Sequence, residues 1–426
     1  MPSMAATPSV AIDADRLWSR LMALARIGAT PDGGVDRQAL TDGEAAAWRQ
    51  VIAWGGEAGL VAATDAAANL FLAWRGRDPS LAPVLAGSHL DTQPTGGRFD
   101  GAFGVLAALE AVTALAGAGV VPARDVLIVA WMNEEGSRFA PGMMGSEAFA
   151  GERPLARIRA ATDAAGATAG AEIDRLLAAF PELPRRPLGF PVAAYLEPHI
   201  EQNTLLEAAG TAIGVVTGIQ GKKTFEVEIR GAKGHAGTLP MAGRRDAVAA
   251  FGRVATALHE AIGARDPEAL FTIGRVEVSP NAPSVVADRV RFRIDLRHPD
   301  NAVLDACGEL VGRLGAERAA PCAATVTPLV SAPSNGFDET LRGMIAEAAA
   351  ARGVAAMPVL SFAGHDARQM AGLAPSAMIF IPCRGGVSHA PEEWAEPAHV
   401  AAGAQVLCDV LGRLALAPTS AAAARR

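Results

Sequence analysis

Long apolar runs alternate with helical segments along much of this chain, and this alternation most constrains the fold. Residues 81–89 and 125–132 are apolar at nearly every position, which is typical of strands buried on both faces of a sheet. Residues 13–28, 44–59 and 102–119 carry apolar side chains at helical spacing instead. Strands and helices in alternation predict an α/β fold with a mainly parallel sheet covered by helices on both faces.

The pattern changes after Gly218, where strands with apolar and polar residues in strict alternation begin. The order there is strand, helix, two strands, helix, strand, which is typical of a smaller α+β sandwich. We therefore expect an inserted domain at 219–330, acting as a lid and in dimerisation, between two parts of a catalytic domain at 1–218 and 331–426. A length of 426 residues is consistent with two domains.

Composition excludes several classes of protein. The formal net charge of −7 argues against a protein that binds nucleic acid or an acidic membrane surface. The four cysteines are scattered and form no CxxC motif, so we expect free thiols. The first residues do not resemble a signal peptide, and we find no uninterrupted apolar stretch long enough to span a bilayer. We expect a cytoplasmic protein with no nucleic-acid or membrane partner.

Polar side chains of the metal-ligand type follow the expected strands. The loop GSHLDTQPTGGRFDG at 87–101 follows one strand, and the others lie in MNEEG, in the expected short helix at 199–210, and in SHAPEEW after a strand at 376–383. Taken one at a time, each side chain has an ordinary explanation as a helix cap, a solvated strand end or a structural histidine. The residues in question are His89, Asp91, Asp100, Glu134, Glu135, His199 and His389.

Taken together, these side chains indicate a metal site. Ligands bind beyond the carboxyl ends of the strands in an open α/β sheet, so the side chains should meet at one edge. Their excess of carboxylate charge would be balanced by divalent cations, and a set of imidazoles and carboxylates suits zinc, manganese, cobalt or nickel. One carboxylate of the Glu134–Glu135 pair can hold metal while the other takes a proton from water. The favoured chemistry is metal-assisted hydrolysis.

Seven motifs in order and spacing resemble the M20 metallopeptidase superfamily. They are GSHLDTQPTGGRFDG, MNEEGSRF, EPHIEQ, GHAGTLPMAGRRDA, DLRHPD, AGHDA and GGVSHAPEEW. The resemblance covers about residues 15 to 415. Within the superfamily, the chain most resembles the hydantoinase/carbamoylase amidases. M20 peptidases usually have a carboxylate where this chain has His199, and that histidine is the feature that narrows the resemblance.

The resemblance implies two divalent metal ions per subunit, Zn²⁺ or Mn²⁺, with Co²⁺ or Ni²⁺ as alternatives. Glu134 would be the general base, and Asp91 would orient His89. Asp100 would bridge the two cations. The implied ligands are His89, Asp100 and His199 for one cation, and Asp100, Glu135 and His389 for the other.

The resemblance also implies the residues that contact substrate and the assembly. Gln202 and the pocket wall at Gly364 and His365 would face the substrate, and Arg297 would bind its carboxylate. His235 would stabilise the oxyanion, in the active site of the partner subunit of a homodimer.

Departures from the family pattern fall where substrate is recognised. HIEQGP is replaced by HIEQNT, with Asn203 and Thr204, and SGAGHD is replaced by SFAGHD, with Phe362 in place of glycine. The family's substrate-contacting asparagine falls on Ser284, although Asn281 lies three residues earlier. The resemblance therefore supports the chemistry more strongly than the identity of the substrate.

The leading hypothesis is an amidohydrolase that cleaves N-carbamoyl-L-amino acids or a related ureido or amide acid. There are three alternative substrates: allantoate, the ureido acid that a β-ureidopropionase cleaves, and an N-acyl amino acid. A non-catalytic metal-binding protein is a hypothesis of another class, but it would need neither Glu134 nor His235. A nucleotide-binding oxidoreductase is excluded because no GxGxxG motif follows a strand.

We predict that Ser284→Asn raises kcat/KM for N-carbamoyl amino acids about tenfold, or roughly 1.4 kcal/mol of transition-state binding. The physical reason is that serine offers one short hydroxyl where an amide would donate and accept hydrogen bonds. Steady-state kinetics of both proteins would measure the gain. An efficient wild-type enzyme that gains nothing from the substitution would contradict the missing contact.

Overall fold

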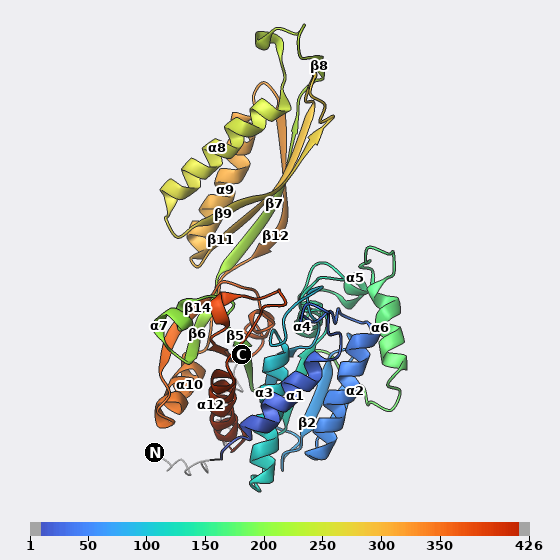
Figure 1. Cartoon of the computed structure of the whole chain (residues 1–426), viewed down its shortest axis with the longest axis vertical. Helices are drawn as coiled ribbons and strands as arrows, with labels where there is room; N and C mark the ends of the chain where they lie inside the picture. The colour runs from blue at the N-terminus through green and yellow to red at the C-terminus, as the bar shows by residue number, and fades with distance from the viewer. Residues whose placement is uncertain (1–9, 417–426) are drawn as a thin grey trace. The chain divides into compact units, whose positions relative to one another are not determined.

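The structure, a computed structural model, describes residues 10–416. Its internal contacts divide into two compact units, each described here by itself (Figure 1). The first unit contains the chain up to Gly218 and again from Gly336, and the second contains Ile219–Asn335. The segment 219–330, expected as an inserted domain, lies inside the second unit.

The first unit is built on a mixed sheet with the strand order β1-β2-β4-β3-β5-β15-β6-β13, with β14 paired to β6. Its centre is parallel, because β3 pairs in parallel with β4 and β5, and β5 with β15. The mainly parallel sheet expected from the sequence is therefore confirmed. The bounds are β1 Val61–Thr64, β2 Leu70–Trp74, β3 Val84–His89, β4 Val126–Trp131, β5 Ala194–Ile200, β6 Ile213–Ile219, β13 Asn335–Gly336, β14 Ala356–Ser361 and β15 Ser376–Ile381.

Helices cover this sheet, and the most buried of them is α3, which begins directly after the GSHLDTQPTGGRFDG loop. It is apolar on all sides, as expected for a helix that packs against the sheet on one side and other helices on the other. The bounds are α1 Ala14–Ala25, α2 Asp42–Glu57, α3 Ala102–Gly117, α4 Met144–Ala150, α5 Leu155–Arg159, α6 Ala169–Ala178, α7 Leu205–Ala209, α10 Glu339–Ala351, α11 Ala367–Met370 and α12 Pro397–Leu416.

One sequence expectation needs correction here. Residues 199–210 were expected as a short helix, but β5 continues through Ile200 and α7 begins only at Leu205. Every residue of β5 is buried between two parallel neighbours, a tertiary effect that local spacing does not reveal. α12 has the length and mean hydropathy of a membrane span, but it is interrupted by Asp409 and Arg413 and is not a continuous apolar stretch. Its buried residues pack in the core against α3 and β15.

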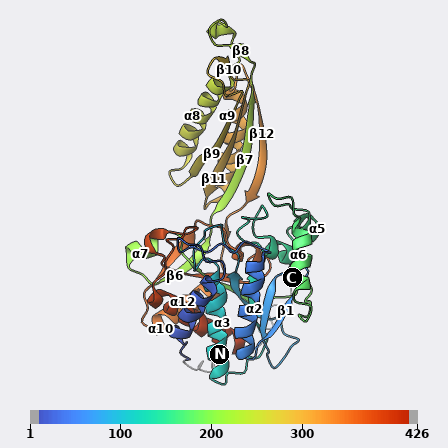
Figure 2. The ribbon, with the colours of Figure 1, turned by 45° about the vertical axis from the view of Figure 1, so that its right-hand side comes forward.

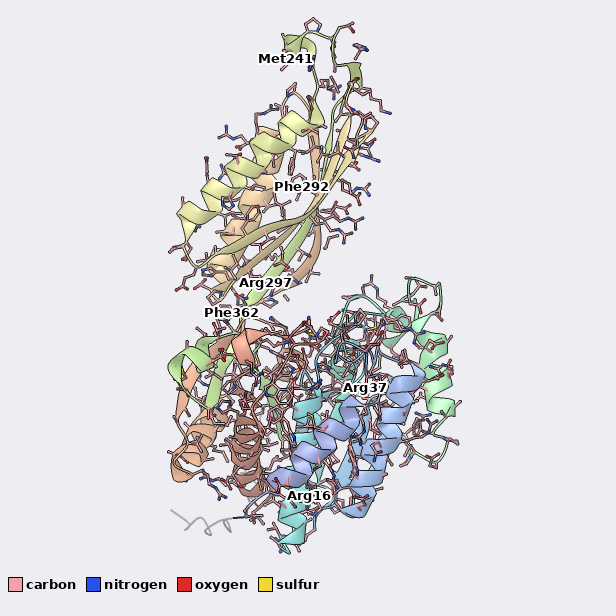
Figure 3. All side chains as sticks on the ribbon, viewed as in Figure 1. Arg16, Arg37, Met241, Phe292, Arg297 and Phe362 are labelled. Atoms are coloured by element: carbon pink, nitrogen blue, oxygen red, sulfur yellow. The ribbon has the colours of Figure 1, made fainter. Side chains whose placement is uncertain are left out.

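The second unit is a four-stranded antiparallel sheet with the order β12-β7-β11-β9 and with α8 and α9 on one face (Figures 1 and 2). On β11, buried Val290, Phe292, Ile294 and Leu296 alternate with polar residues, and Phe292 lies between the strands and the helices (Figure 3). The bounds are β7 Gly221–Arg230, β8 Gly234–His235, α8 Ala247–Arg265, β9 Leu270–Ser279, β10 Val285–Val286, β11 Arg289–His298, α9 Asn301–Arg318 and β12 Ala323–Ala332. The expected α+β sandwich is confirmed.

Candidate metal centre

The strand order of the first unit brings the expected ligand residues to one edge of the sheet. β4, β3, β5 and β15 are neighbours in the sheet and run parallel, so their carboxyl ends lie on the same side. Each of these strands delivers one or two side chains at its carboxyl end, and the loop before α3 delivers another. The side chains are His89 from β3, Glu134 and Glu135 after β4, His199 from β5, His389 after β15, and Asp100 from the loop.

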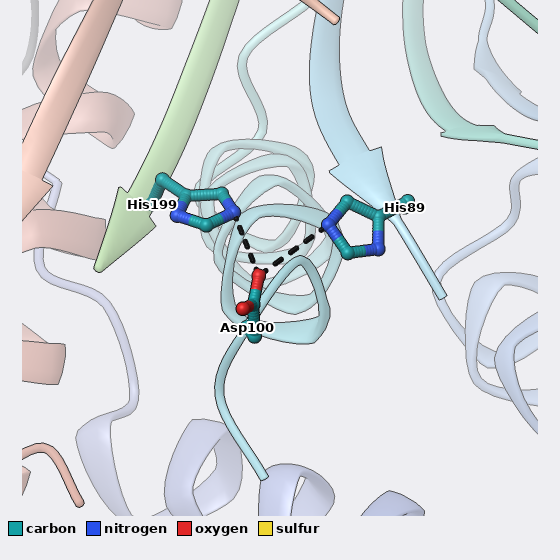
Figure 4. Close-up of side chains that lie close together, drawn as sticks. All are labelled: His89, Asp100 and His199. Carbon is teal, nitrogen blue, oxygen red and sulfur yellow. Dashed lines mark ion pairs between the residues drawn. The ribbon is translucent and has the colours of Figure 1, made fainter. Parts of the chain in front are cut away.

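The carboxylate of Asp100 is the centre of the cluster. Its Oδ1 lies 3.1 Å from Nε2 of His199 and 3.5 Å from Nε2 of His89 (Figure 4). Its Oδ2 lies 3.2 Å from Nε2 of His389, which is also 3.4 Å from Oε2 of Glu135. The ligand-type atoms therefore form two groups that share Asp100, and each group is compact enough to hold one metal ion.

Two of the three imidazoles are oriented by backbone carbonyl groups. Nδ1 of His89 lies 2.9 Å from the carbonyl oxygen of Asp91, and Nδ1 of His199 lies 2.9 Å from that of Ile200. Nδ1 donates in these hydrogen bonds, so each Nε2 has a lone pair for a cation once the proton that it shares with Asp100 is lost. Metal-binding histidines are typically held in this way, so the donor set fits a divalent cation.

Asp91 contributes its backbone carbonyl to His89, whereas its carboxylate serves another segment. Its Oδ1 is 3.7 Å from Nδ1 of His89, which is beyond hydrogen-bonding distance. Its two oxygens instead accept the backbone N–H groups of Glu134 and Glu135, each at 3.2 Å. Asp91 therefore fixes the loop that carries the carboxylate pair.

The two carboxylates of this pair have different surroundings. Glu135 belongs to the group with Asp100 and His389, and Gln93 donates to its carboxylate from both the backbone and the side-chain amide. Glu134 belongs to neither of the two groups that share Asp100, and its Oε2 is 3.6 Å from Nε2 of His89. Burial raises the pKa of Glu134 well above its usual range and that of Glu135 to about 7.

The carboxylates and imidazoles of the cluster shift one another's pKa values against the effect of burial. Burial would raise the pKa of Asp100, but hydrogen bonds from His199, His389 and His89 hold it well below its usual range. Burial would also lower the pKa of His89, yet the neighbouring carboxylates raise it well above its usual value. Divalent cations compete with protons for these imidazoles, because a ligand nitrogen must be unprotonated.

A glycine beside the cluster is required by space and by backbone conformation. Gly101 has φ of 62°, and a Cβ atom there would lie 2.4–2.5 Å from atoms of the His89 ring. Any side chain would push the ring out of place and strain the backbone. The glycine-rich composition of this loop thus lets Asp100 and the start of α3 approach the histidines closely.

The remaining predicted residues of the first unit lie around the centre. Gln202 donates from Nε2 to Oδ2 of Asp100 at 2.8 Å, and its Oε1 is buried with no hydrogen-bond partner among the residues that the structure describes. The ring of His365 packs 4.5 Å from that of His199, and burial and His199 lower its pKa well below the usual value. The backbone at Gly364 lies against the side chain of Met143.

Four predicted residues belong to the second unit. Ser284 accepts a hydrogen bond at its carbonyl from the N–H of Ala236, next to His235. Asn281 lies in the same region and lines a hollow of about 400 Å³. Arg297 lies on β11, where its Nε donates to Oδ1 of Asp295 at 2.8 Å.

Sequence reasoning missed Glu197, a fully buried carboxylate on β5. It accepts hydrogen bonds from the hydroxyl of Ser88 at 2.7 Å and from the backbone N–H of Ala367, also at 2.7 Å. It thereby ties the segment after His365 to the centre of the sheet. Its position two residues before His199 in EPHIEQ places both side chains on one face of the strand, a signal available in the sequence.

Comparisons with known proteins agree with this geometry. Residues 85–413 match peptidase family M20/M25/M40. The chain is 38% identical to an N-carbamoyl-L-amino-acid amidohydrolase of Rhizobium meliloti over 93% of this chain and 95% of that protein. It is 36% identical to one of Geobacillus stearothermophilus, over 95% of this chain and 99% of that protein. A crystal structure of a hydantoinase/carbamoylase family amidase from Burkholderia multivorans has 40% identity and a TM-score of 0.87, covering 97% of this chain and 100% of that one.

The chain therefore belongs to the M20/M25/M40 family, in its hydantoinase/carbamoylase amidase branch. It is a metal-dependent amidohydrolase, and the resemblance drawn from the seven motifs is confirmed.

We predict that the metal-free protein loses stability as pH rises from about 6.5 to 9. The hydrogen bond to Asp100 raises the pKa of His389 from 6.5 to about 9. A raised pKa stabilises the fold below the unfolded value, and that stabilisation disappears as pH rises through the folded value. Thermal unfolding of chelator-treated protein should show a larger fall in Tm for the wild type than for His389→Asn. Equal falls would contradict this contribution of His389.

Proposed function

We propose that this enzyme hydrolyses the ureido C–N bond of N-carbamoyl-L-amino acids, releasing the amino acid, ammonia and carbon dioxide. The proposal extends the family assignment to a substrate class, and it is supported by the relatives named above. The observation that carries the chemistry is the pair of ligand groups around Asp100 with an adjacent carboxylate outside both.

In this proposal, two divalent cations, Zn²⁺ or Mn²⁺, are held by the two groups of ligands. His89, Asp100 and His199 would hold one, and Asp100, Glu135 and His389 would hold the other. When bound, the cations would polarise the ureido carbonyl and make water more acidic.

Glu134 is proposed as the general base. It directly precedes the proposed ligand Glu135, and Asp91 holds the backbone of both. As a carboxylate outside both ligand groups, it can accept a proton from water and then pass it to the leaving nitrogen. Gln202, with its unpartnered buried Oε1, offers an acceptor for a substrate N–H.

The substrate side chain is proposed to be apolar and larger than that of the simplest amino acids. Phe362 precedes His365 by three residues, and its aromatic side chain is 38% exposed. In the family pattern a glycine occupies this position, so Phe362 adds exposed apolar surface three residues before His365.

The second unit is proposed to supply Arg297 and His235 to two different active sites. On β11, Arg297 lies opposite Lys222 in the strand register, near the start of β7. His235 lies five residues after Arg230, the last residue of β7. From Lys222 to Arg230 the strand rises about 27 Å, at roughly 3.4 Å per residue. Figure 3 labels Arg297 at one end of this unit and Met241, six residues after His235, at the other.

One small substrate therefore cannot contact both side chains from a single second unit. A homodimer removes the difficulty, because one protomer can provide the substrate-carboxylate clamp and its partner the oxyanion donor. This supports the lid and dimerisation roles proposed for the second unit.

We predict that Glu134→Gln lowers kcat about 10²–10⁴-fold while the metal content stays unchanged, because the amide cannot accept a proton. The assay measures free amine and ammonia separately on N-carbamoyl amino acids, allantoate and N-acyl amino acids. Wild-type enzyme should release amine and ammonia in equal amounts from N-carbamoyl amino acids. Glu135→Gln is the control and should lose metal. Metal loss in Glu134→Gln would reverse the two roles, and wild-type preference for allantoate or N-acyl amino acids would overturn the substrate class.

We predict complementation between two inactive variants, Glu134→Gln and His235→Ala. A mixed dimer has one site with both Glu134 and His235 intact if His235 acts in the partner's site. A random equal mixture should then recover about a quarter of wild-type activity, since half of the dimers are mixed and each has one intact site of two. Subunit exchange is checked by native mass spectrometry. Exchange without recovery would show that His235 acts within its own chain or not at all.

A further inference from the structure

Glu393 is a buried carboxylate without a role in the proposed reaction. It lies four residues after His389, between β15 and α12, and its side chain is 1% exposed. The neighbouring Glu392 is exposed. Burying a carboxylate is unfavourable unless hydrogen bonds compensate the lost hydration, so the partners of Glu393 indicate what it does.

Its first oxygen holds the backbone that carries Asp100. Oε1 of Glu393 accepts the backbone N–H groups of Phe99 at 2.7 Å and of Asp100 at 3.1 Å. These residues come directly before Gly101, the N-cap of α3. The carboxylate therefore lies at the positive end of a long buried helix, where a negative charge is favoured.

The second carboxylate oxygen of Glu393 lies beside a serine hydroxyl that also contacts the carboxylate of Asp100. Oε2 of Glu393 lies 3.1 Å from Oγ of Ser388, and that hydroxyl lies 2.8 Å from Oδ2 of Asp100. A hydroxyl has one proton to donate, and the shorter contact is the one to Asp100. Gln202 donates to the same hydroxyl at 3.0 Å, which completes its hydrogen bonding. Glu393 thus restrains the backbone of Asp100 directly, and its second oxygen lies against the hydroxyl that donates to the Asp100 side chain.

The chain leaves room for this carboxylate at Gly97. A Cβ atom built at Gly97 would lie 1.9–2.2 Å from the carboxyl atoms of Glu393. The φ angle of Gly97 is not in the left-handed region, so space and not backbone conformation excludes a side chain here. Gly97→Ala would therefore displace Glu393 without removing any hydrogen-bonding group.

We propose that Glu393 is a positioning residue of the metal centre, which fixes the direction in which Asp100 presents its carboxylate to the three histidines. Metal sites tolerate errors of only about 0.2 Å in ligand distances, and loss of a group that orients a ligand lowers metal affinity about 10–100-fold. The inference rests on the family's metal dependence and on the proposed ligand role of Asp100. It does not rest on the identity of the substrate.

The test measures metal affinity directly, with Mn²⁺ and Zn²⁺ in competition with a chelator and no substrate present. We expect the affinity for at least one cation to fall about tenfold in Glu393→Gln, which keeps one acceptor oxygen, and about 100-fold in Glu393→Leu. Gly97→Ala should weaken affinity in the same way with Glu393 still present. Glu392→Gln is the matched control in the same segment and should bind both cations as the wild type does.

Thermal unfolding of the metal-free variants separates positioning from simple stabilisation. A purely structural Glu393 would lower the Tm of the metal-free protein and leave the metal affinity of the folded protein unchanged, which would overturn the proposal. If Glu393→Leu does not fold, Glu393→Gln and Gly97→Ala decide the question. Wild-type affinity in both of them would equally overturn it. The visible spectrum of the Co²⁺-loaded Glu393→Gln protein should also differ from that of the wild type, because it reports ligand geometry.

Discussion

The buried carboxylate of Asp100 is the constraint on which the rest of the site depends. A carboxylate that is 4% exposed is tolerable only where positive or polarised groups surround it. Three imidazole nitrogens within 3.5 Å provide this compensation, and they come from β3, from β5 and from the segment after β15. Strand order is therefore a functional property of this fold, since only the order β3-β5-β15 places the histidines around one acid.

Hydrogen bonds to the backbone hold this arrangement in place. Asp91 accepts two N–H groups of the loop that carries the carboxylate pair, and Glu393 accepts two from the segment that carries Asp100. Glu197 accepts another from the segment after His365. Each is a buried acid that accepts backbone N–H groups, so the loops around the centre are held in one geometry although they have little regular structure.

In the second unit, the geometry of the sheet sets the distance between two residues of proposed function. Its sheet is stiff and antiparallel, with a core between β11 and the two helices, so the separation between Arg297 and His235 is set by strand length. In the proposed dimer, this spacing would let each protomer bind one end of its own substrate and assist the reaction of its partner. The candidate metal ligands lie in the first unit, whereas the residues proposed to recognise substrate are divided between the units, with Phe362 in the first and Ser284 in the second.

The sequence by itself determined the types of structure and the ligand chemistry. Apolar runs and their periodicity predicted the parallel strands, buried α3 and the α+β sandwich, because burial sets local spacing. The histidines and acids at strand ends predicted the metal centre, because parallel strands end at one edge. Only the tertiary structure decided that His199 ends a strand, that the carbonyl of Asp91 orients His89, and that Glu393 supports Asp100. These features join segments as far apart as residues 99 and 393, and no local pattern records which distant segments pack together.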